Sequence, residues 1–334
     1  MSVDTDVPVR VPAQAEPLLE IEDLVVEFDT QQGTVHALSG VDLVVGRGET
    51  LSIVGESGSG KSTLVKAILG LTPAKSGTIR YADTDLLQLD RRTFRRLRAD
   101  LQLIMQDPVS SLNPRWRVND IVAEGLRIWP DRVRSTVAEQ VDEGLDAVGM
   151  SGDEIGHRKP GQFSGGQCQR IAIARALAVR PEALFCDEAV SALDVSVQAM
   201  VINLLADAKE RFGLTMVFVS HDLGVVKSLS DRVMVMYLGR VCEVGSVYDV
   251  FESPQHPYTH LLLASAPGST TEPEQVEVAV LPSPLDPPSG CRFRTRCLRA
   301  TELCAREAPP LATVAPGHAV ACHHPVTADR PTLR

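Results

Sequence analysis

The chain has 334 residues, 44% of them hydrophobic, which is enough to bury a sizeable core and suggests one large domain plus an appendage, or two smaller units. Its net charge of -10 and pI near 5.3 argue against a nucleic-acid binder whose affinity rests on neutralising phosphates. No segment has the roughly 20 consecutive apolar residues that span a bilayer, and the N-terminus lacks the apolar core of a signal peptide. We therefore expect a globular protein that stays in the cytoplasm.

The N-terminal part predicts a tail, two strands and a strand-turn-helix unit. Residues 1–17 are rich in Pro, Ala, Val and Asp without periodicity, which predicts a mobile tail. Apolar β-branched runs over 19–28 and 41–45 predict strands of a half-buried antiparallel sheet. Residues 50–54 predict an apolar strand that leads into a glycine-rich turn, and the apolar spacing from Lys61 onward predicts a helix after that turn.

The middle of the chain predicts a helical subdomain inserted into an α/β core. Residues 108–160 are mostly helical in pattern, with an apolar stripe at Val133, Val137, Val141, Leu145 and Val148. The segments after this insert alternate between the two kinds of element, as in α/β units around a parallel sheet. They are a helix over 165–179, a strand over 183–186, a helix over 195–212 and a strand over 215–219.

The segment GESGSGKST, residues 55–63, has the spacing of a phosphate-binding loop. Its glycines let backbone N–H groups turn inward around phosphate oxygens, and the helix start that follows adds a positive dipole end. We expect Lys61 to reach the β- and γ-phosphates and Ser62 to hold Mg²⁺. The nucleotide-binding residues predicted in this loop are Gly55, Ser57, Gly58, Gly60, Lys61, Ser62 and Thr63.

Two carboxylates, Asp187 and Glu188, follow the predicted strand ALFC. Asp187 suits Mg²⁺ binding through water, and Glu188 suits polarising the water that attacks the γ-phosphorus. Taken alone, the pair is equally compatible with a solvated acidic helix cap. A further motif, FSGGQCQR at residues 163–170, opens a helix with Ser and two glycines and so predicts a second phosphate-binding helix start.

The order of these motifs resembles that of the ABC ATPases over about residues 19–250. The resemblance rests on GESGSGKST, Gln106, FSGGQCQR, LFCDE, SALD at residues 191–194, and His221. It implies an α/β P-loop NTPase fold with an antiparallel β subdomain and the helical insert. It also implies a head-to-tail dimer that buries two Mg-ATP molecules, in which the FSGGQCQR motif of one subunit covers the γ-phosphate held by the other.

The same resemblance implies roles for residues outside the loop. His221 would reach the γ-phosphate and help position the water, while Gln106 would touch Mg²⁺ or water. Phe28 would stack on adenine, with an ordinary core aromatic as the alternative. Asp194 would lie at the dimer contact. The residues implied to cover the partner's γ-phosphate are Ser164, Gly165, Gly166 and Gln167.

Two departures from the family pattern flank the acidic pair. Cys186 stands where a small or aliphatic residue usually precedes the aspartate, and Ala189 and Val190 replace the common Pro-Thr after the glutamate. Neither departure removes a charged participant, so we expect hydrolysis to survive.

The C-terminal segment indicates which kind of ABC ATPase the chain resembles. From residue 253 the proline density rises, which predicts a linker to a compact cysteine-bearing unit. The runs SPQHPYTHLLLASAP, GCRFRTRC and GHAVACHH resemble the C-terminal extension of ATP-binding subunits of oligopeptide, dipeptide and nickel importers. The implied partners are two transmembrane permease subunits, a second ATP-binding subunit, identical or different, and an extracytoplasmic substrate-binding protein. The implied location is the cytoplasmic face of the cell membrane.

Four of the seven cysteines cluster in this extension, at Cys291, Cys297, Cys304 and Cys322. Structural zinc sites usually begin with cysteines two to four residues apart, a spacing that this cluster lacks. Four thiolates without that spacing fit a [4Fe-4S] cluster, which some members of the resembled family also imply. Zinc and free or oxidised thiols remain alternatives. The isolated Cys168, Cys186 and Cys242 are predicted to be core or helix residues.

The sequence thus predicts a tail (1–17), an ABC ATPase domain (18–252) and an extension (253–334). The predicted function is ATP hydrolysis coupled to the uptake of oligopeptides or dipeptides. Import of nickel or another small solute is the alternative within the same transporter type. An exporter motor, and an ABC ATPase that acts in DNA repair or on ribosomes, are the alternatives outside it.

Overall fold

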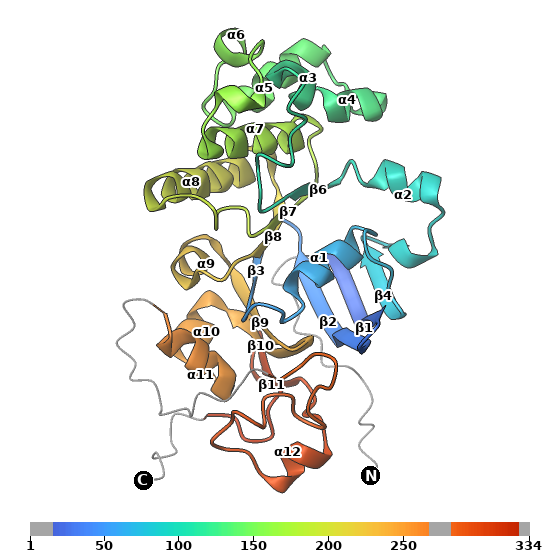
Figure 1. Cartoon of the computed structure of the whole chain (residues 1–334), viewed down its shortest axis with the longest axis vertical. Helices are drawn as coiled ribbons and strands as arrows, with labels where there is room; N and C mark the ends of the chain where they lie inside the picture. The colour runs from blue at the N-terminus through green and yellow to red at the C-terminus, as the bar shows by residue number, and fades with distance from the viewer. Residues whose placement is uncertain (1–15, 267–281, 327–334) are drawn as a thin grey trace. The chain divides into compact units, whose positions relative to one another are not determined.

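The computed structural model describes residues 16–266 and 282–326, which divide into two compact units (Figure 1). Of the described residues, the first unit contains 16–87, 221–266 and 282–326, and the second contains 88–220. The predicted tail lies outside the described residues except for residues 16 and 17, and Pro17 already begins a strand. Within the described ranges, no helix is long and apolar enough to cross a membrane.

One sheet of the first unit is antiparallel, as predicted, and has the strand order β2-β1-β4-β5. Its two long strands pair Leu19 with Val45 and Ile21 with Leu43, so that apolar side chains fall on a common buried face. A bulge follows Ile21, and Asp23 there has a φ of 44°. The strands are β1 (Pro17–Thr30), β2 (Gly33–Gly46), β4 (Ser76–Tyr81) and β5 (Thr84–Asp85).

The other sheet of this unit has the order β11-β12-β10-β9-β3, in which β3 and β9 are parallel and the other pairs antiparallel. Its strands are β3 (Thr50–Val54), β9 (Arg232–Tyr237), β10 (Arg240–Ser246), β11 (Ala312–Ala315) and β12 (His318–Val320). The helices are α1 (Lys61–Ile68), α9 (Leu223–Leu229), α10 (Val247–Glu252), α11 (Pro257–Ala264) and α12 (Glu302–Arg306). The bounds of β3 agree with the prediction because its apolar run ends directly at the loop glycine.

The second unit contains three parallel strands, β6 (Leu101–Ile104), β7 (Ala183–Asp187) and β8 (Thr215–Val219). The strand β7 lies between the other two and pairs with both. The predicted parallel α/β pattern is therefore confirmed for this part of the chain. The helices are α2 (Arg91–Leu97), α3 (Val118–Val122), α4 (Glu124–Ile128), α5 (Val137–Asp146), α6 (Gly152–Ile155), α7 (Gly165–Ala178) and α8 (Val195–Phe212).

Two local predictions were wrong. The apolar stripe was expected to begin at Val133, but that residue is extended, because the Thr136–Glu139 capping box starts α5 only at Val137. The first part of the proline-rich segment after residue 253 was expected to belong to a linker, yet Pro257 is the first residue of α11, and residues 267–281 of that segment lie outside the described residues. Proline is favoured at a first helical position, where its missing N–H has no partner to lose.

A buried ion pair in the first unit gives a prediction on stability. Nη1 of Arg232 lies 2.8 Å from Oε1 of Glu49, and the two side chains are only 4% and 7% exposed. Replacing Arg232 by Ala leaves the Glu49 carboxylate buried without its cation, which should cost about 3–5 kcal/mol of unfolding free energy. We expect a clearly lower urea midpoint, followed by circular dichroism. Arg47→Ala, which removes the 3.9 Å contact between Nε of a 38% exposed arginine side chain and Glu16, serves as the control, so an equal loss in both variants would contradict the prediction.

Candidate nucleotide site

The phosphate-binding loop joins β3 to α1 in the first unit, and its glycines are required by geometry. Gly55, Gly58 and Gly60 have φ values of 148°, 79° and 102°, which favour glycine. A Cβ added at Gly55 would lie 2.1 Å from the Met236 carbonyl oxygen. Gly60 is also the N-cap of α1 and offers no side chain to cover the first N–H groups of the helix. The loop is thus shaped to receive an anion at a helix start.

Lys61 is folded back over this loop. Its side-chain nitrogen Nζ donates to the carbonyl oxygens of Gly55, at 2.7 Å, and Glu56, at 2.9 Å, and the residue is only 5% exposed. Carbonyl groups therefore hold the ammonium inside the curve of the loop. Ser62 and Thr63 follow in the first turn of α1, and the Ser62 hydroxyl is an oxygen donor of the kind that Mg²⁺ prefers.

Two predicted residues of the first unit lie outside the loop. Phe28 is in β1 and is 39% exposed, so it is not the buried core aromatic that was the alternative. Adenine stacking on its ring stays a prediction. His221 is exposed and immediately precedes Asp222, the N-cap of α9.

In the second unit, the structure brings together Gln106 and Glu188. Nε2 of Gln106 donates to Oε2 of Glu188 at 3.1 Å and lies 3.4 Å from the Ser191 hydroxyl. Asp187 is the last residue of β7, and the backbone N–H of Glu188 donates to the Val219 carbonyl at 3.0 Å. Glu188 has a φ of 51°, a left-handed conformation that costs a non-glycine residue about 1 kcal/mol. The end of β7 therefore orients the Glu188 carboxylate at the cost of backbone strain.

The departures beside this pair are core residues. Ala189 and Val190 are 1% and 2% exposed, and Cys186 is fully buried. Burial, together with the charge of Asp187, raises the pKa of Cys186 to about 12, so the thiol stays neutral. Cys168 and Cys242 are buried as well, which confirms the prediction for the isolated cysteines.

The FSGGQCQR motif begins α7 with a capping box. The Ser164 hydroxyl accepts from the Gln167 N–H at 3.3 Å, and the Gln167 side chain accepts from the Ser164 N–H at 3.0 Å. A Cβ at Gly166 would lie 2.3 Å from Cγ1 of Val197, whereas one at Gly165 would meet nothing within 4 Å. Gly166 thus allows α7 to approach α8, and Gly165 leaves open space at the helix start.

Asp194 similarly serves as the N-cap of α8. Its carboxylate accepts from the Ser196 hydroxyl at 2.6 Å and from the Val197 N–H at 3.0 Å, and these bonds lower its pKa. Sequence reasoning gave Ser164, Gln167 and Asp194 only ligand or dimer roles. The capping role was visible in the sequence as Ser or Asp directly before a helix.

The four clustered cysteines line one cavity of the first unit, together with His256, His323 and His324. Burial is the main cause that raises the pKa of Cys291, Cys297 and Cys322, in the last to about 12. Over residues 16–266 and 282–326, no group of three or more His, Cys, Asp or Glu side chains is arranged to hold a metal ion. The predicted [4Fe-4S] cluster therefore stays a prediction.

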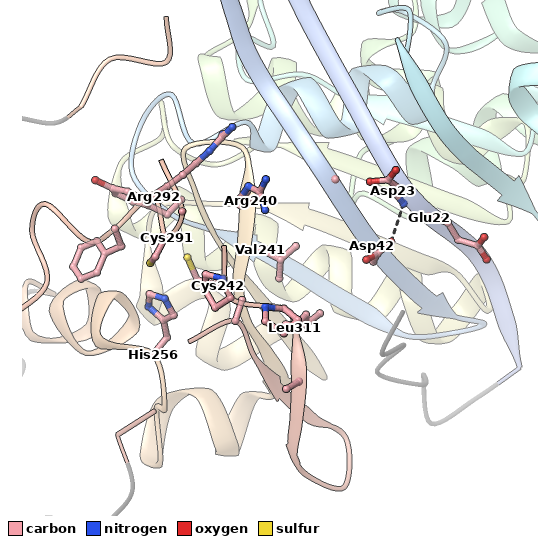
Figure 2. A pocket seen from close by; sticks show the side chains of 18 residues that line it. Glu22, Asp23, Asp42, Arg240, Val241, Cys242, His256, Cys291, Arg292 and Leu311 are labelled. Carbon is pink, nitrogen blue, oxygen red and sulfur yellow. Dashed lines mark hydrogen bonds between the residues drawn. The ribbon is translucent and has the colours of Figure 1, made fainter. Parts of the chain in front are cut away.

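A neighbouring cavity of about 620 Å³ is lined by both acidic and basic residues. Figure 2 shows Cys242 and Cys291 on one side and Asp23 and Asp42 on the other, with the Asp23 N–H donating to Asp42 Oδ1 at 2.8 Å. None of the described residues that line it belongs to the predicted nucleotide site.

Sequence reasoning gave no role to three residues, one within the phosphate-binding loop and two that contact it. Glu56 lies within the loop, and its backbone and side chain contact Tyr258 and Arg296 from the C-terminal part of the chain. The only signals in the sequence were the run HPYT and the arginines interleaved with the cysteines.

Comparisons with known proteins identify the family of this chain. Residues 38–191 match the ABC transporter family, and residues 242–304 match the oligopeptide/dipeptide transporter C-terminal region. The oligopeptide transport ATP-binding protein OppF of Salmonella typhimurium is 46% identical over 92% of this chain and 96% of its own length. OppF of Escherichia coli is 46% identical over 88% of this chain and 92% of its own length.

Solved structures of ATP-binding cassettes share the fold of this chain. A dimeric ATP-binding cassette in a post-hydrolysis state, bound to ADP and Pi, superposes with a TM-score of 0.62 at 28% identity, over 69% of this chain and 98% of that one. The cbiO1 protein of Clostridium perfringens, part of an ABC transporter complex, superposes with a TM-score of 0.63 at 29% identity. The superposition covers 71% of this chain and 92% of the cbiO1 chain. The chain therefore belongs to the family of ATP-binding subunits of oligopeptide-type ABC transporters.

Proposed function

We propose that this chain hydrolyses ATP to drive oligopeptide uptake as the ATP-binding subunit of an ABC importer. The observation that carries the proposal is the glycine-shaped loop with Lys61 folded inside it, in a chain that also has the oligopeptide-transporter C-terminal region. The substrate class follows from the OppF relatives, which are oligopeptide transport ATP-binding proteins.

The proposed chemistry is in-line attack by water on the γ-phosphorus. The water oxygen bonds to phosphorus as the bond to the β–γ bridging oxygen breaks, which releases ADP and phosphate. Glu188 accepts the proton from the water, and Gln106, bonded to that carboxylate, helps to orient it. Lys61 stabilises negative charge on the β- and γ-phosphates, and His221 contacts the γ-phosphate.

Further assignments complete the proposed nucleotide site. Phe28 stacks on adenine, and the start of α7, from Ser164 to Gln167, binds the γ-phosphate held by a second subunit. Ser62, Gln106 and Asp187 are the proposed Mg²⁺ residues, and their oxygen donors fit this hard cation. When bound, the ion neutralises charge on the β- and γ-phosphate oxygens.

The proposed assembly places the chain at the cytoplasmic face of the cell membrane. Its partners are two permease subunits, a second ATP-binding subunit and an extracytoplasmic substrate-binding protein. The proposed domain division keeps the ATPase domain at 18–252, with the helical subdomain at about 108–160, and assigns the extension to 253–334. The match of residues 242–304 to the transporter C-terminal region supports such an extension.

The test is to tag the chain in its own host, extract membranes gently and identify every co-purifying protein. Two permeases, an ATP-binding subunit and a binding protein are the expected result, and peptide uptake is then compared with nickel uptake in a deletion strain. Recovery of ribosomal or DNA-repair proteins without any membrane chain would overturn the transport proposal and leave the ATPase chemistry intact.

We also propose that Cys291, Cys297, Cys304 and Cys322 hold a [4Fe-4S] cluster of structural or redox-regulatory role. The support is that all four side chains line one cavity, which Arg294 and Arg299 also line and where positive charge suits a cluster of net negative charge. Burial raises the pKa of Cys291, Cys297 and Cys322, and cluster ligands are thiolates, so loading of the cluster should release protons.

The prediction is about four iron atoms and four sulfides per chain after anaerobic purification. Cys297→Ser should lose most of the iron, whereas Cys168→Ser, which alters a buried cysteine of the second unit, should keep it. Stoichiometric zinc in place of iron, or equal iron in both variants, would contradict the cluster.

A further inference from the structure

We propose that Arg296 and Tyr258 are positioning residues for nucleotide binding, because they hold Glu56 of the phosphate-binding loop from the C-terminal part of the chain. The inference rests on the proposed nucleotide site and deepens it. Under this proposal, the loop that carries Cys291 and Cys297 stabilises the conformation of the nucleotide site.

Arg296 donates hydrogen bonds to the Glu56 carboxylate from both terminal nitrogens of its guanidinium group. Nη1 lies 2.8 Å from Oε2, and Nη2 lies 3.0 Å from Oε1, which is the bidentate geometry that fixes both partners. The Arg296 side chain is only 12% exposed. Its guanidinium carbon lies 5.7 Å from the ring centroid of Tyr237 and 5.8 Å from that of Phe293. The pair is therefore more protected than an ordinary surface ion pair.

Tyr258 holds the backbone of the same residue. Its hydroxyl oxygen accepts from the Glu56 N–H at 2.8 Å, and the side chain is fully buried. The centroid of the Tyr258 ring lies 4.7 Å from that of Tyr237 and 5.4 Å from that of Phe293. The aromatic rings that contact Arg296 therefore also hold Tyr258 in place. The Glu56 carbonyl in turn accepts from Nζ of Lys61 at 2.9 Å. One residue thus connects the C-terminal part of the chain to the phosphate-binding lysine.

Charge explains why this contact matters for ATP. Glu56 places a carboxylate in a loop that must receive the polyanionic phosphates, and like charges at short range weaken binding. Arg296 neutralises that carboxylate at two hydrogen bonds. Without Arg296 the carboxylate would repel the nucleotide and release one anchor of the loop.

The position of Arg296 is set by the cysteine-bearing loop. Its N–H donates to the Phe293 carbonyl at 2.9 Å, and the N–H of the next residue, Cys297, donates to the Arg294 carbonyl at 3.4 Å. The Cys291 N–H donates to the Cys304 carbonyl at 2.8 Å. A rearrangement of the cysteines would therefore move Arg296 relative to Glu56.

The test is a double-mutant cycle on the full chain, read as ATP affinity by isothermal titration, with melting temperature recorded for each protein. Arg296→Ala should weaken ATP binding on the order of tenfold. Adding Glu56→Gln to that variant should recover most of the loss, since the unpaired charge is gone. Arg306→Ala, which alters a 72% exposed arginine that forms an ion pair with Glu302, is the matched control.

A second variant removes the other anchor. Tyr258→Phe keeps the buried ring and deletes the acceptor, so ATP affinity should fall severalfold at a melting temperature close to that of the wild type. Tyr248→Phe alters a 73% exposed tyrosine and is its control. Wild-type affinity in both Arg296→Ala and Tyr258→Phe, or no recovery in the double variant, overturns the inference. Absence of ATP binding by the wild-type chain would instead overturn the proposed function itself.

Discussion

Replacing Glu188 by Gln is expected to lower kcat for ATP hydrolysis by about 10³-fold and to leave ATP binding intact. The amide has the shape of the carboxylate but cannot accept the proton of the attacking water, and general bases typically contribute about 10²- to 10⁴-fold. The side chain should still lie within hydrogen-bonding reach of Gln106, because only one oxygen is replaced. We also expect the variant to accumulate as an ATP-bound dimer, since hydrolysis no longer resolves it.

Phosphate release at saturating Mg-ATP measures the first effect, and size-exclusion chromatography with ATP measures the second. Glu210→Gln, an exposed glutamate on α8, is the matched control. Turnover of Glu188→Gln at the wild-type rate would mean that another group accepts the proton.

The parts of the site that sequence reasoning predicted are those that are local in the chain. The strand β3, the glycine loop and α1 lie within residues 50–68, so spacing alone places the loop between a strand and a helix. The two carboxylates at the end of β7 were predictable for the same reason, because β7 and β8 have short apolar runs with clear ends.

The parts that the sequence could not reveal depend on distant contacts or on backbone conformation. Arg296 and Glu56 are 240 residues apart, and no local period relates them. The left-handed backbone of Glu188 is likewise invisible, since any residue type other than glycine predicts φ below zero. The arginine-rich helix α2 buries none of its residues, so no apolar stripe signals it, and its start is marked only by the N-cap Asp90.

Replacing Lys61 by Ala is expected to weaken ATP binding about a hundredfold or more, in contrast to Glu188→Gln. The substitution removes a 5% exposed ammonium that lies inside the loop, and it leaves the Gly55 and Glu56 carbonyl oxygens without that donor. Charge-assisted hydrogen bonds at buried sites are worth several kcal/mol, so the loss of phosphate affinity should far exceed that of a surface lysine.

Isothermal titration with Mg-ATP measures the effect, and a thermal melt of each protein separates lost affinity from lost folding. Lys66→Ala, which alters an exposed lysine of the same helix, is the matched control. Near wild-type ATP affinity in a folded Lys61→Ala chain would mean that the loop does not bind the phosphates through this lysine. Because Glu188→Gln should keep affinity and lose turnover, whereas Lys61→Ala should lose both, the two variants together separate phosphate binding from activation of the water.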